Sequence, residues 1–191
     1  MTADALSELV ALARARHDEA LEGLYRELHP ALVGFLTGLA PLDAEDLAAE
    51  AWIAAAHCLG SFAGDGADFR RLLFTIARRR AIDDGRKRRR RRTEPTDPTE
   101  LRELATADDP GALVADVDSS RQAIRRVVEL LPPDQAEIVL LRVVAGLTVG
   151  EVARVVGRSS ASISLLQHRA LRRLAARMET GPKSEPESSF R

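Results

Sequence analysis

The sequence predicts an all-α protein made of two small helical domains joined by a flexible acidic linker. Only 4% of its 191 residues are aromatic, and aromatic and β-branched residues are the usual strand formers. Apolar residues recur every three or four positions over most of the chain, which is the spacing of an amphipathic helix. Residues 93–118 break this spacing with prolines and many acidic side chains, so they are predicted to be the linker.

The first domain is expected within residues 1–92. Apolar residues at helical spacing from 5 to 39 fit two helices or one broken helix. Asp43 and Asp46 are typical of an N-cap and an acidic first turn. They predict a further helix that runs to about Leu59.

A loop and a basic helix are expected next. Residues 60–68 hold too many glycines for a helix interior, and another helical run begins at Phe69. From residue 78 to residue 92 there are ten basic side chains, nine of them arginine, although the whole chain has a net charge of −1. Unpaired guanidinium groups are too costly to bury. The block therefore needs water or an anionic partner, and nucleic acid is the first hypothesis; a solvated charged run is the alternative.

The second domain is expected over residues 119–178, and residues 179–191 are expected to be a disordered tail. A helix is predicted from about Ser119 to Leu131, where two prolines end it. Asp134 is then expected to cap the next helix.

Two short helices complete the second domain. Thr148 and Glu151 form the pattern of a capping box, and Gly157 supplies the turn after the helix that they start. Ser159 or Ser160 is expected to cap the last helix, which carries several arginines. Two short helices joined by a glycine turn are typical of a helix-turn-helix. A packing module without a role in DNA binding is the alternative.

The order of these elements resembles the extracytoplasmic-function (ECF, or group IV) sigma factors of bacterial RNA polymerase, members of the sigma-70 family that carry sigma regions 2 and 4. The similarity covers nearly all residues from 6 to 177 in the right order. The segments similar to regions 2.1, 2.2, 2.3 to 2.4 and 4 are, in turn, residues 20–25, 43–52, 69–78, and 131–135 with 146–153.

The resemblance implies a protein that binds core RNA polymerase, through the β′ coiled coil and the β flap, and directs promoter-specific transcription initiation. Promoter DNA and an anti-sigma factor are the other expected partners. The sequence has no glycine-rich phosphate loop, no recognisable catalytic triad and no metal-ligand spacing among its four histidines. We therefore expect no enzymatic activity, no cofactor and no metal. With no apolar stretch of about 18 residues, the protein is expected to be cytoplasmic and not inserted in a membrane.

The resemblance also assigns roles to individual residues. The expected polymerase contacts are Asp43, Asp46 and Glu50. The expected contacts to the minus-ten region of the promoter are Ser61, Phe62, Arg78, Arg79, Arg80, Arg86 and Lys87. The expected contacts to the minus-thirty-five region are Arg158, Ser159, Ser160, Ser162, Ser164, Gln167, His168 and Arg169.

Some of these residues have a structural interpretation beside the functional one. Asp46 could serve only to complement the helix dipole. Phe62 either forms the wall of a pocket for a flipped base or anchors its loop to the core. Asp83 and Asp84 are more simply explained as intrahelical partners of neighbouring basic residues than as a catalytic pair. Cys58 is interpreted as a small core residue.

The chain departs from the family pattern at several positions. Leu72 and Arg79 stand where the family usually has Trp and Asn, and Ser164 and Leu166 stand where basic residues are common. Reading of the minus-thirty-five element would then depend on other polar side chains. Two further functions stay open: a stand-alone helix-turn-helix regulator, and a sigma-like protein that acts through protein contacts alone.

Overall fold

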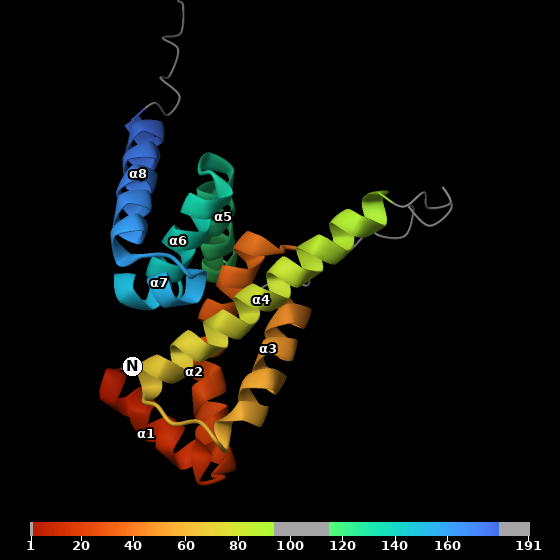
Figure 1. Cartoon of the computed structure of the whole chain (residues 1–191), viewed down its shortest axis with the longest axis vertical. Helices are drawn as coiled ribbons and strands as arrows, with labels where there is room; N and C mark the ends of the chain where they lie inside the picture. The colour runs from red at the N-terminus through yellow and green to blue at the C-terminus, as the bar shows by residue number, and fades with distance from the viewer. Residues whose placement is uncertain (1, 94–114, 180–191) are drawn as a thin grey trace, which may run out of the picture.

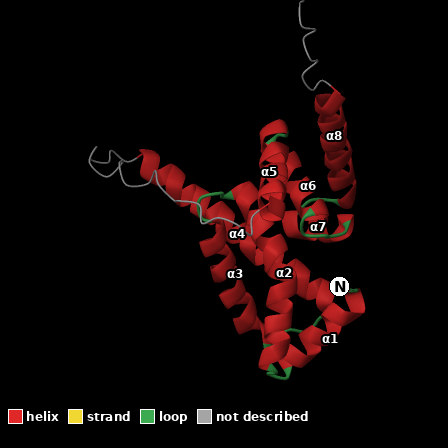
Figure 2. Ribbon diagram, turned by 180° about the vertical axis from the view of Figure 1, so that it is seen from behind, coloured by secondary structure: helices red, strands yellow, loops and turns green. Residues whose placement is uncertain are grey.

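The computed structural model describes residues 2–93 and 115–179, which form α-helices and no strand (Figures 1 and 2). The all-α class is confirmed. Most of the predicted linker and the predicted tail from residue 180 lie outside the described residues. None of the described helices is long and apolar enough to cross a lipid bilayer. The eight helices of the described residues are α1 (Ala3–Arg14), α2 (Asp18–Leu39), α3 (Ala44–Leu59), α4 (Gly66–Thr93), α5 (Ala115–Leu130), α6 (Pro133–Val143), α7 (Val149–Val156) and α8 (Ser160–Glu179).

Helices α1 to α4 form an N-terminal bundle around α2. The side chains of Phe35, Phe69 and Phe74 are fully buried in its core. The Phe35 and Phe74 rings meet edge to face with their centroids 5.6 Å apart, an arrangement that aromatic quadrupoles favour. The apolar spacing over residues 5–39 thus produces two helices, of which α2 supplies the centre of the bundle.

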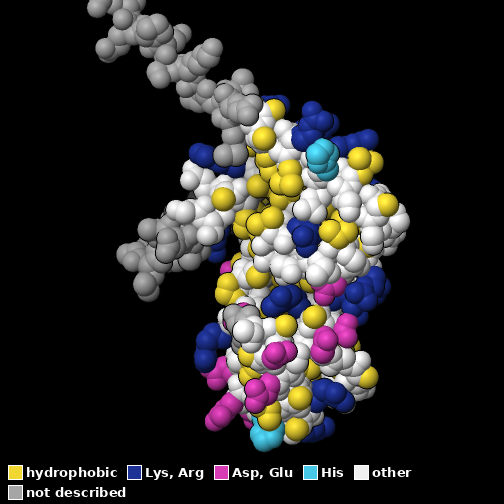
Figure 3. All heavy atoms as spheres, turned by 90° about the vertical axis from the view of Figure 1, so that its left-hand side faces the viewer, with side chains coloured by type: hydrophobic (Ala, Val, Ile, Leu, Met, Phe, Trp, Pro, Cys, Tyr) yellow, Lys and Arg dark blue, Asp and Glu magenta, His cyan; other side chains and the backbone are white. Residues whose placement is uncertain are grey.

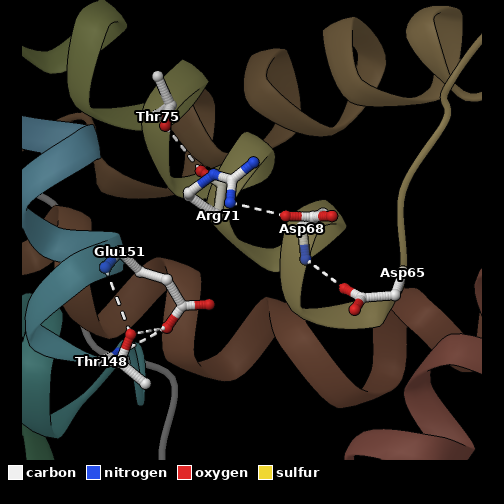
Figure 4. A network of polar contacts seen from close by, with 6 residues as sticks. All are labelled: Asp65, Asp68, Arg71, Thr75, Thr148 and Glu151. Carbon is white, nitrogen blue, oxygen red and sulfur yellow. Dashed lines mark hydrogen bonds and ion pairs between the residues drawn. The ribbon is translucent and has the colours of Figure 1, made fainter.

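The glycine-rich loop before α4 is shorter than predicted, because α4 begins at Gly66. Oδ1 of Asp65 accepts the backbone N–H of Asp68 at 2.9 Å and so caps the first turn (Figure 4). The Gly66 N–H donates to Oγ of Ser7 on α1 at 3.0 Å. A Cβ at Gly66 would lie 2.7 Å from the carbonyl carbon of Leu6, so a glycine is required where these two helices touch.

Asp43 occupies the N-cap position of α3, but its side chain makes no capping hydrogen bond. Its carboxylate instead forms an ion pair with Arg88 on α4. The predicted start of α3 is therefore correct, but the Asp43 side chain does not make the capping hydrogen bond that was expected of it. The nearby guanidinium is a charged partner for the carboxylate, whereas a backbone N–H is a neutral one.

Helices α5 and α6 begin earlier than predicted. Helix α5 starts at Ala115, within the segment expected to be linker. Helix α6 starts at Pro133, with Pro132 in the N-cap position and Asp134 in the first turn. Proline is favoured at the first helical position because its φ angle is already helical and its missing N–H would have had no partner there. Asp134 is thus not the cap.

The helix-turn-helix geometry of α7 and α8 follows the sequence closely. Oγ1 of Thr148 accepts the Glu151 N–H at 3.3 Å, and the Glu151 carboxylate accepts the Thr148 N–H at 2.6 Å (Figure 4). This is the predicted capping box. Gly157 ends α7 with a φ of 74°, a left-handed conformation that glycine adopts without steric cost. Ser159, one of the two predicted caps of α8, accepts the Ser162 N–H at 3.2 Å.

Helices α5 to α8 form a C-terminal bundle, which packs on the end of α2 (Figure 2). Gly34 and Gly38 of α2 face this bundle. A Cβ at Gly34 would lie 3.2 Å from Ile124 of α5, and one at Gly38 would lie 2.3 Å from Cδ1 of Leu140 on α6. The two bundles consequently share one continuous apolar core.

We expect the substitution Thr148→Ala to lower the free energy of unfolding by about 1 kcal/mol, because it removes the side-chain cap of α7. Urea unfolding followed by circular dichroism measures the change. Thr148→Ser keeps the hydroxyl and serves as the control, which should retain most of the stability. Equal losses for the two variants would contradict the capping role.

Candidate functional site

The arginine block is part of one continuous helix. Helix α4 runs without a break from Gly66 to Thr93, and its end extends past α3 (Figure 1). The block is therefore helical along its whole length. Among the α4 side chains whose exposure the structure describes, the exposed basic ones are Arg79, Arg86, Lys87, Arg89, Arg90 and Arg91.

Acidic residues within α4 offset part of this charge. Asp83 lies 3.3 Å from Nη1 of Arg86, and Asp84 lies 2.9 Å from Nε of Arg88. Both pairs are intrahelical, at the spacing that brings side chains together on a helix surface. The interpretation of the two aspartates as intrahelical partners of neighbouring basic residues is therefore correct.

Three consecutive arginines of α4 have three different surroundings. Arg79 is exposed. Arg80 forms an ion pair with Glu50 of α3. Arg78 points to the C-terminal bundle, where its Nε donates to Oε1 of Glu137 at 2.6 Å and its Nη2 lies 3.4 Å from Oε2. Only Arg79 among these three offers its guanidinium to solvent with no ion pair described for it.

The loop that precedes α4 holds Ser61 at the surface and Phe62 half-buried. The Phe62 ring meets the buried Phe69 ring edge to face, with the centroids 5.8 Å apart. This contact favours the interpretation that Phe62 anchors the loop. The Ser61 hydroxyl donates to the carbonyl of Cys58 at 3.2 Å. Cys58 itself is exposed, so its predicted place in the core is wrong.

One side of α3 is open to solvent and mixes charge with apolar surface. Asp46, Glu50 and Ile53 are exposed at helical spacing along it, and Ile53 keeps 59% of its surface accessible. Asp43 is held by Arg88 and has only 29% of its side chain exposed. Ile53 was not among the predicted contacts. A large apolar residue on the polar side of a helix can nevertheless be recognised in a sequence, and it can indicate an interaction surface.

The helix-turn-helix presents the outer side of α8. Ser164, His168 and Arg169 are exposed there, together with the apolar Leu165, which is 50% exposed. Gln167 is half-buried, and its Oε1 accepts Nε of Arg142 at 3.3 Å.

The first turn of α8 is partly engaged in local contacts. Ser159 uses its hydroxyl as the helix cap, and Ser162 is half-buried. Ser160 and Arg158 are exposed, and Arg158 lies 3.9 Å from Asp134. The eight predicted minus-thirty-five contacts, six in α8 and two just before it, thus differ in how far they are exposed and in whether they have local partners.

Surface charge differs between the two bundles. On the face that includes α8, Asp and Glu side chains gather in the lower part of the view, whereas Lys and Arg side chains occur in both parts and stand without acidic neighbours in the upper one (Figure 3). Arg172, Arg173 and Arg177 give α8 further exposed positive charge. A polyanion would therefore be attracted to the C-terminal bundle on this face.

Two family descriptions match this chain, Sigma-70 region 2 over residues 24–92 and Sigma-70, region 4 over residues 121–174. The ECF RNA polymerase sigma factor BldN of Streptomyces coelicolor is 33% identical over 160 residues, which cover 83% of this chain and 57% of BldN. The ECF RNA polymerase sigma factor SigD of Mycobacterium tuberculosis is 31% identical over 180 residues, which cover 91% of this chain and 84% of SigD.

Solved structures show the same fold at lower identity. CnrH, in complex with the cytosolic domain of CnrY, superposes with a TM-score of 0.59 at 21% identity, over 93% of this chain and 99% of CnrH. The sigma factor RpoE of Bartonella quintana, in complex with the anti-sigma factor NepR, superposes with a TM-score of 0.61 at 24% identity, over 84% of this chain and 98% of RpoE. The two matched regions and the identity to SigD over most of both chains show that this chain belongs to the ECF sigma factors of RNA polymerase, which direct promoter-specific transcription initiation.

Proposed function

We propose a division of labour among the helices for promoter-directed transcription. Helix α3 binds core polymerase, α4 and its preceding loop meet the minus-ten region, and α8 meets the minus-thirty-five region. One observation carries this proposal: a 28-residue basic helix and a capped helix-turn-helix lie on one chain in the order of the two matched sigma regions. The protein acts by binding, without catalysis, in the cytoplasm where RNA polymerase works.

The polymerase contact rests on the open side of α3. Asp46 gives it negative charge suited to basic side chains of the β′ coiled coil, and Ile53 gives it an apolar centre. Glu50, which is also exposed, would exchange its ion pair with Arg80 for a polymerase contact. Interfaces of this kind depend on an apolar anchor surrounded by polar contacts. The C-terminal bundle would meet the β flap.

The minus-ten contact rests on the exposed basic side chains of α4. Arg79 lies nearest the loop, and Arg86, Lys87 and residues 89–91 continue outward. Phosphate contacts of this kind add affinity and salt dependence without sequence choice. Discrimination of bases would fall to the loop, with Ser61 exposed beside the anchored Phe62.

The minus-thirty-five contact rests on the outward side of α8. A recognition helix places its N-terminal turns against base edges in the major groove. Ser164 and His168 would meet base edges, while Arg158 and Arg169 would meet phosphates. The half-buried Gln167, already bonded to Arg142, would take no direct part.

An anti-sigma factor is the remaining proposed partner. RpoE, which shares the fold, is held in its solved structure by the anti-sigma factor NepR. We propose that a protein of this kind covers the exposed surfaces of this chain when promoter binding is not required.

Mixed with core polymerase and fragmented genomic DNA, the purified chain should give transcripts that begin at discrete sites. Those transcripts should be absent when the chain is left out, because core polymerase alone does not select promoters. Sequencing of transcript 5′ ends measures the result. Failure to bind core polymerase in a pull-down, with DNA binding retained, would favour the stand-alone regulator.

Ile53→Ala should weaken binding to core polymerase about tenfold, because truncation of an apolar anchor removes about 1 to 2 kcal/mol. Fluorescence anisotropy of the labelled chain titrated with core polymerase measures the dissociation constant. Leu12→Ala is the matched control, since Leu12 is 40% exposed on α1, away from the proposed contact. If the two variants lose equal affinity, α3 is not the docking helix.

Replacement of Arg89, Arg90 and Arg91 by glutamine should weaken holoenzyme binding evenly across promoters. It should also make the slope of log K against log salt shallower by about 2, at roughly 0.7 for each phosphate contact to a single strand. Titration at several salt concentrations measures this slope. Arg26→Gln, an exposed site paired with Glu22 at 2.5 Å on α2, is the control. A shift in promoter preference would contradict the proposed role.

A further inference from the structure

Two apolar side chains lie on the outward side of α8, in its first two turns. Ile163 is fully buried, and Leu165, two residues later, points about 200° away from it around the helix axis. Leu165 keeps 50% of its surface exposed, and Ala161, one turn before it, is also exposed. A single exposed leucine needs no explanation on an ordinary surface. This one lies at the centre of the side that faces away from the core.

The hydrogen-bonding side chains of these turns are a poor fit to guanine and adenine. Residues 160–168 contain no arginine, lysine or asparagine. Bidentate reading of guanine uses arginine or lysine, and that of adenine uses asparagine or glutamine. The one amide in this stretch, Gln167, is half-buried and accepts a hydrogen bond from Arg142. Ser164 is exposed, but a serine hydroxyl does not distinguish strongly between bases.

Thymine is the base that carries an apolar group in the major groove. Its C5 methyl group lies there, and apolar side chains contact it, whereas the other bases are recognised by their donors and acceptors. A leucine held against those polar groups would remove their water without offering a hydrogen bond in return. Leu165 therefore favours a thymine and disfavours a pair that presents only polar groups at the same position.

Positive charge follows Leu165 along the same helix. Arg169 and Arg172 are exposed four and seven residues after it, which places them one and two turns further along α8. Arginines in these positions can bind phosphates at the edges of the groove, and such contacts fix the position of the helix without choosing a sequence. The choice of base is then left to the side chains of the first turns.

We propose that Leu165 reads a thymine methyl group in the minus-thirty-five element, so that this element is recognised by apolar contact in place of bidentate hydrogen bonds. The proposal rests on the proposed contact between α8 and that element. It requires a T·A pair at the position that Leu165 meets. Burial of one methyl group corresponds to about a fourfold gain in affinity.

The element is first selected with holoenzyme. The positions upstream of a mapped minus-ten element are randomised in a duplex library, and the bound duplexes are sequenced. The unsubstituted chain should enrich thymine at one or more positions. Leu165→Ala should lose that preference at one of them, whereas Leu171→Ala, at a leucine of α8 that is 49% exposed, should keep it. An element made only of G·C pairs, or a preference unchanged in Leu165→Ala, would overturn the proposal.

The methyl group itself is tested with uracil, which pairs with adenine as thymine does and lacks only the methyl group. Uracil in place of the selected thymine should weaken holoenzyme binding about fourfold for the unsubstituted chain and for Leu171→Ala. It should have almost no effect for Leu165→Ala. Fluorescence anisotropy of the labelled duplex measures the dissociation constants. Equal losses in the three proteins, or no loss in the unsubstituted chain, would show that Leu165 does not read the methyl group.

A second substitution returns the methyl group on another base. Exchange of the selected T·A pair for C·G should weaken binding, and 5-methylcytosine at the same position should recover about fourfold. The recovery should be absent in Leu165→Ala. Because Leu165 is exposed and alanine is the best helix former, this variant should keep its circular dichroism spectrum and its affinity for core polymerase. Recovery that persists in Leu165→Ala would contradict the proposal.

Failure of the proposed function has a different readout. If promoter-specific transcripts form but no upstream position is enriched, the proposed contact between α8 and the minus-thirty-five element fails, and the role of Leu165 fails with it. If upstream positions are enriched but uracil binds as well as thymine, the contact of α8 stands and only the role of Leu165 fails.

Discussion

The close approach of α5 and α6 to α2 is the contact on which the arrangement of the whole molecule depends. One side of α2 places leucines and Phe35 in the N-terminal core. On another side of the same helix, Gly34 and Gly38 leave room for the C-terminal bundle. Helices meet this closely only where side chains are small at the crossing. With that crossing set, the side chain of Glu137 on α6 reaches Arg78 of α4.

Local structure could be predicted from the sequence wherever it depends on residues that are close together in the chain. The capping box at Thr148 and Glu151 and the left-handed Gly157 were predictable because each depends on residues within one turn. Asp43 was assigned a capping bond that it does not make, since its partner Arg88 is distant in sequence. Cys58 was predicted to lie in the core but is exposed. In an alanine-rich helix the sequence does not show clearly which side of the helix is buried. Competition between a local and a distant partner is decided by tertiary structure, which periodicity does not contain.

The candidate site shows the same limit. A run of arginines predicts a partner with negative charge, but successive residues of a helix point about 100° apart. Arg78 and Arg79 are therefore neighbours in sequence with opposite surroundings, one paired across the bundles and the other exposed. Ile53, which we propose as a polymerase contact, was not predicted because only charged residues were sought for that role, although its exposure sets it apart from the buried residues of α3.

Helix α4 also fixes distances. Its 28 residues span about 40 Å at 1.5 Å per residue, roughly the length of a dozen nucleotides at 3.4 Å each. The loop at one end and the outer arginines at the other are thus held at a set separation by a rigid rod. One residue inserted near Gly85 would turn every arginine beyond it by about 100° around the helix axis. In the proposed complex with promoter DNA, the length of this segment, and not only its charge, therefore determines which phosphates the arginines meet.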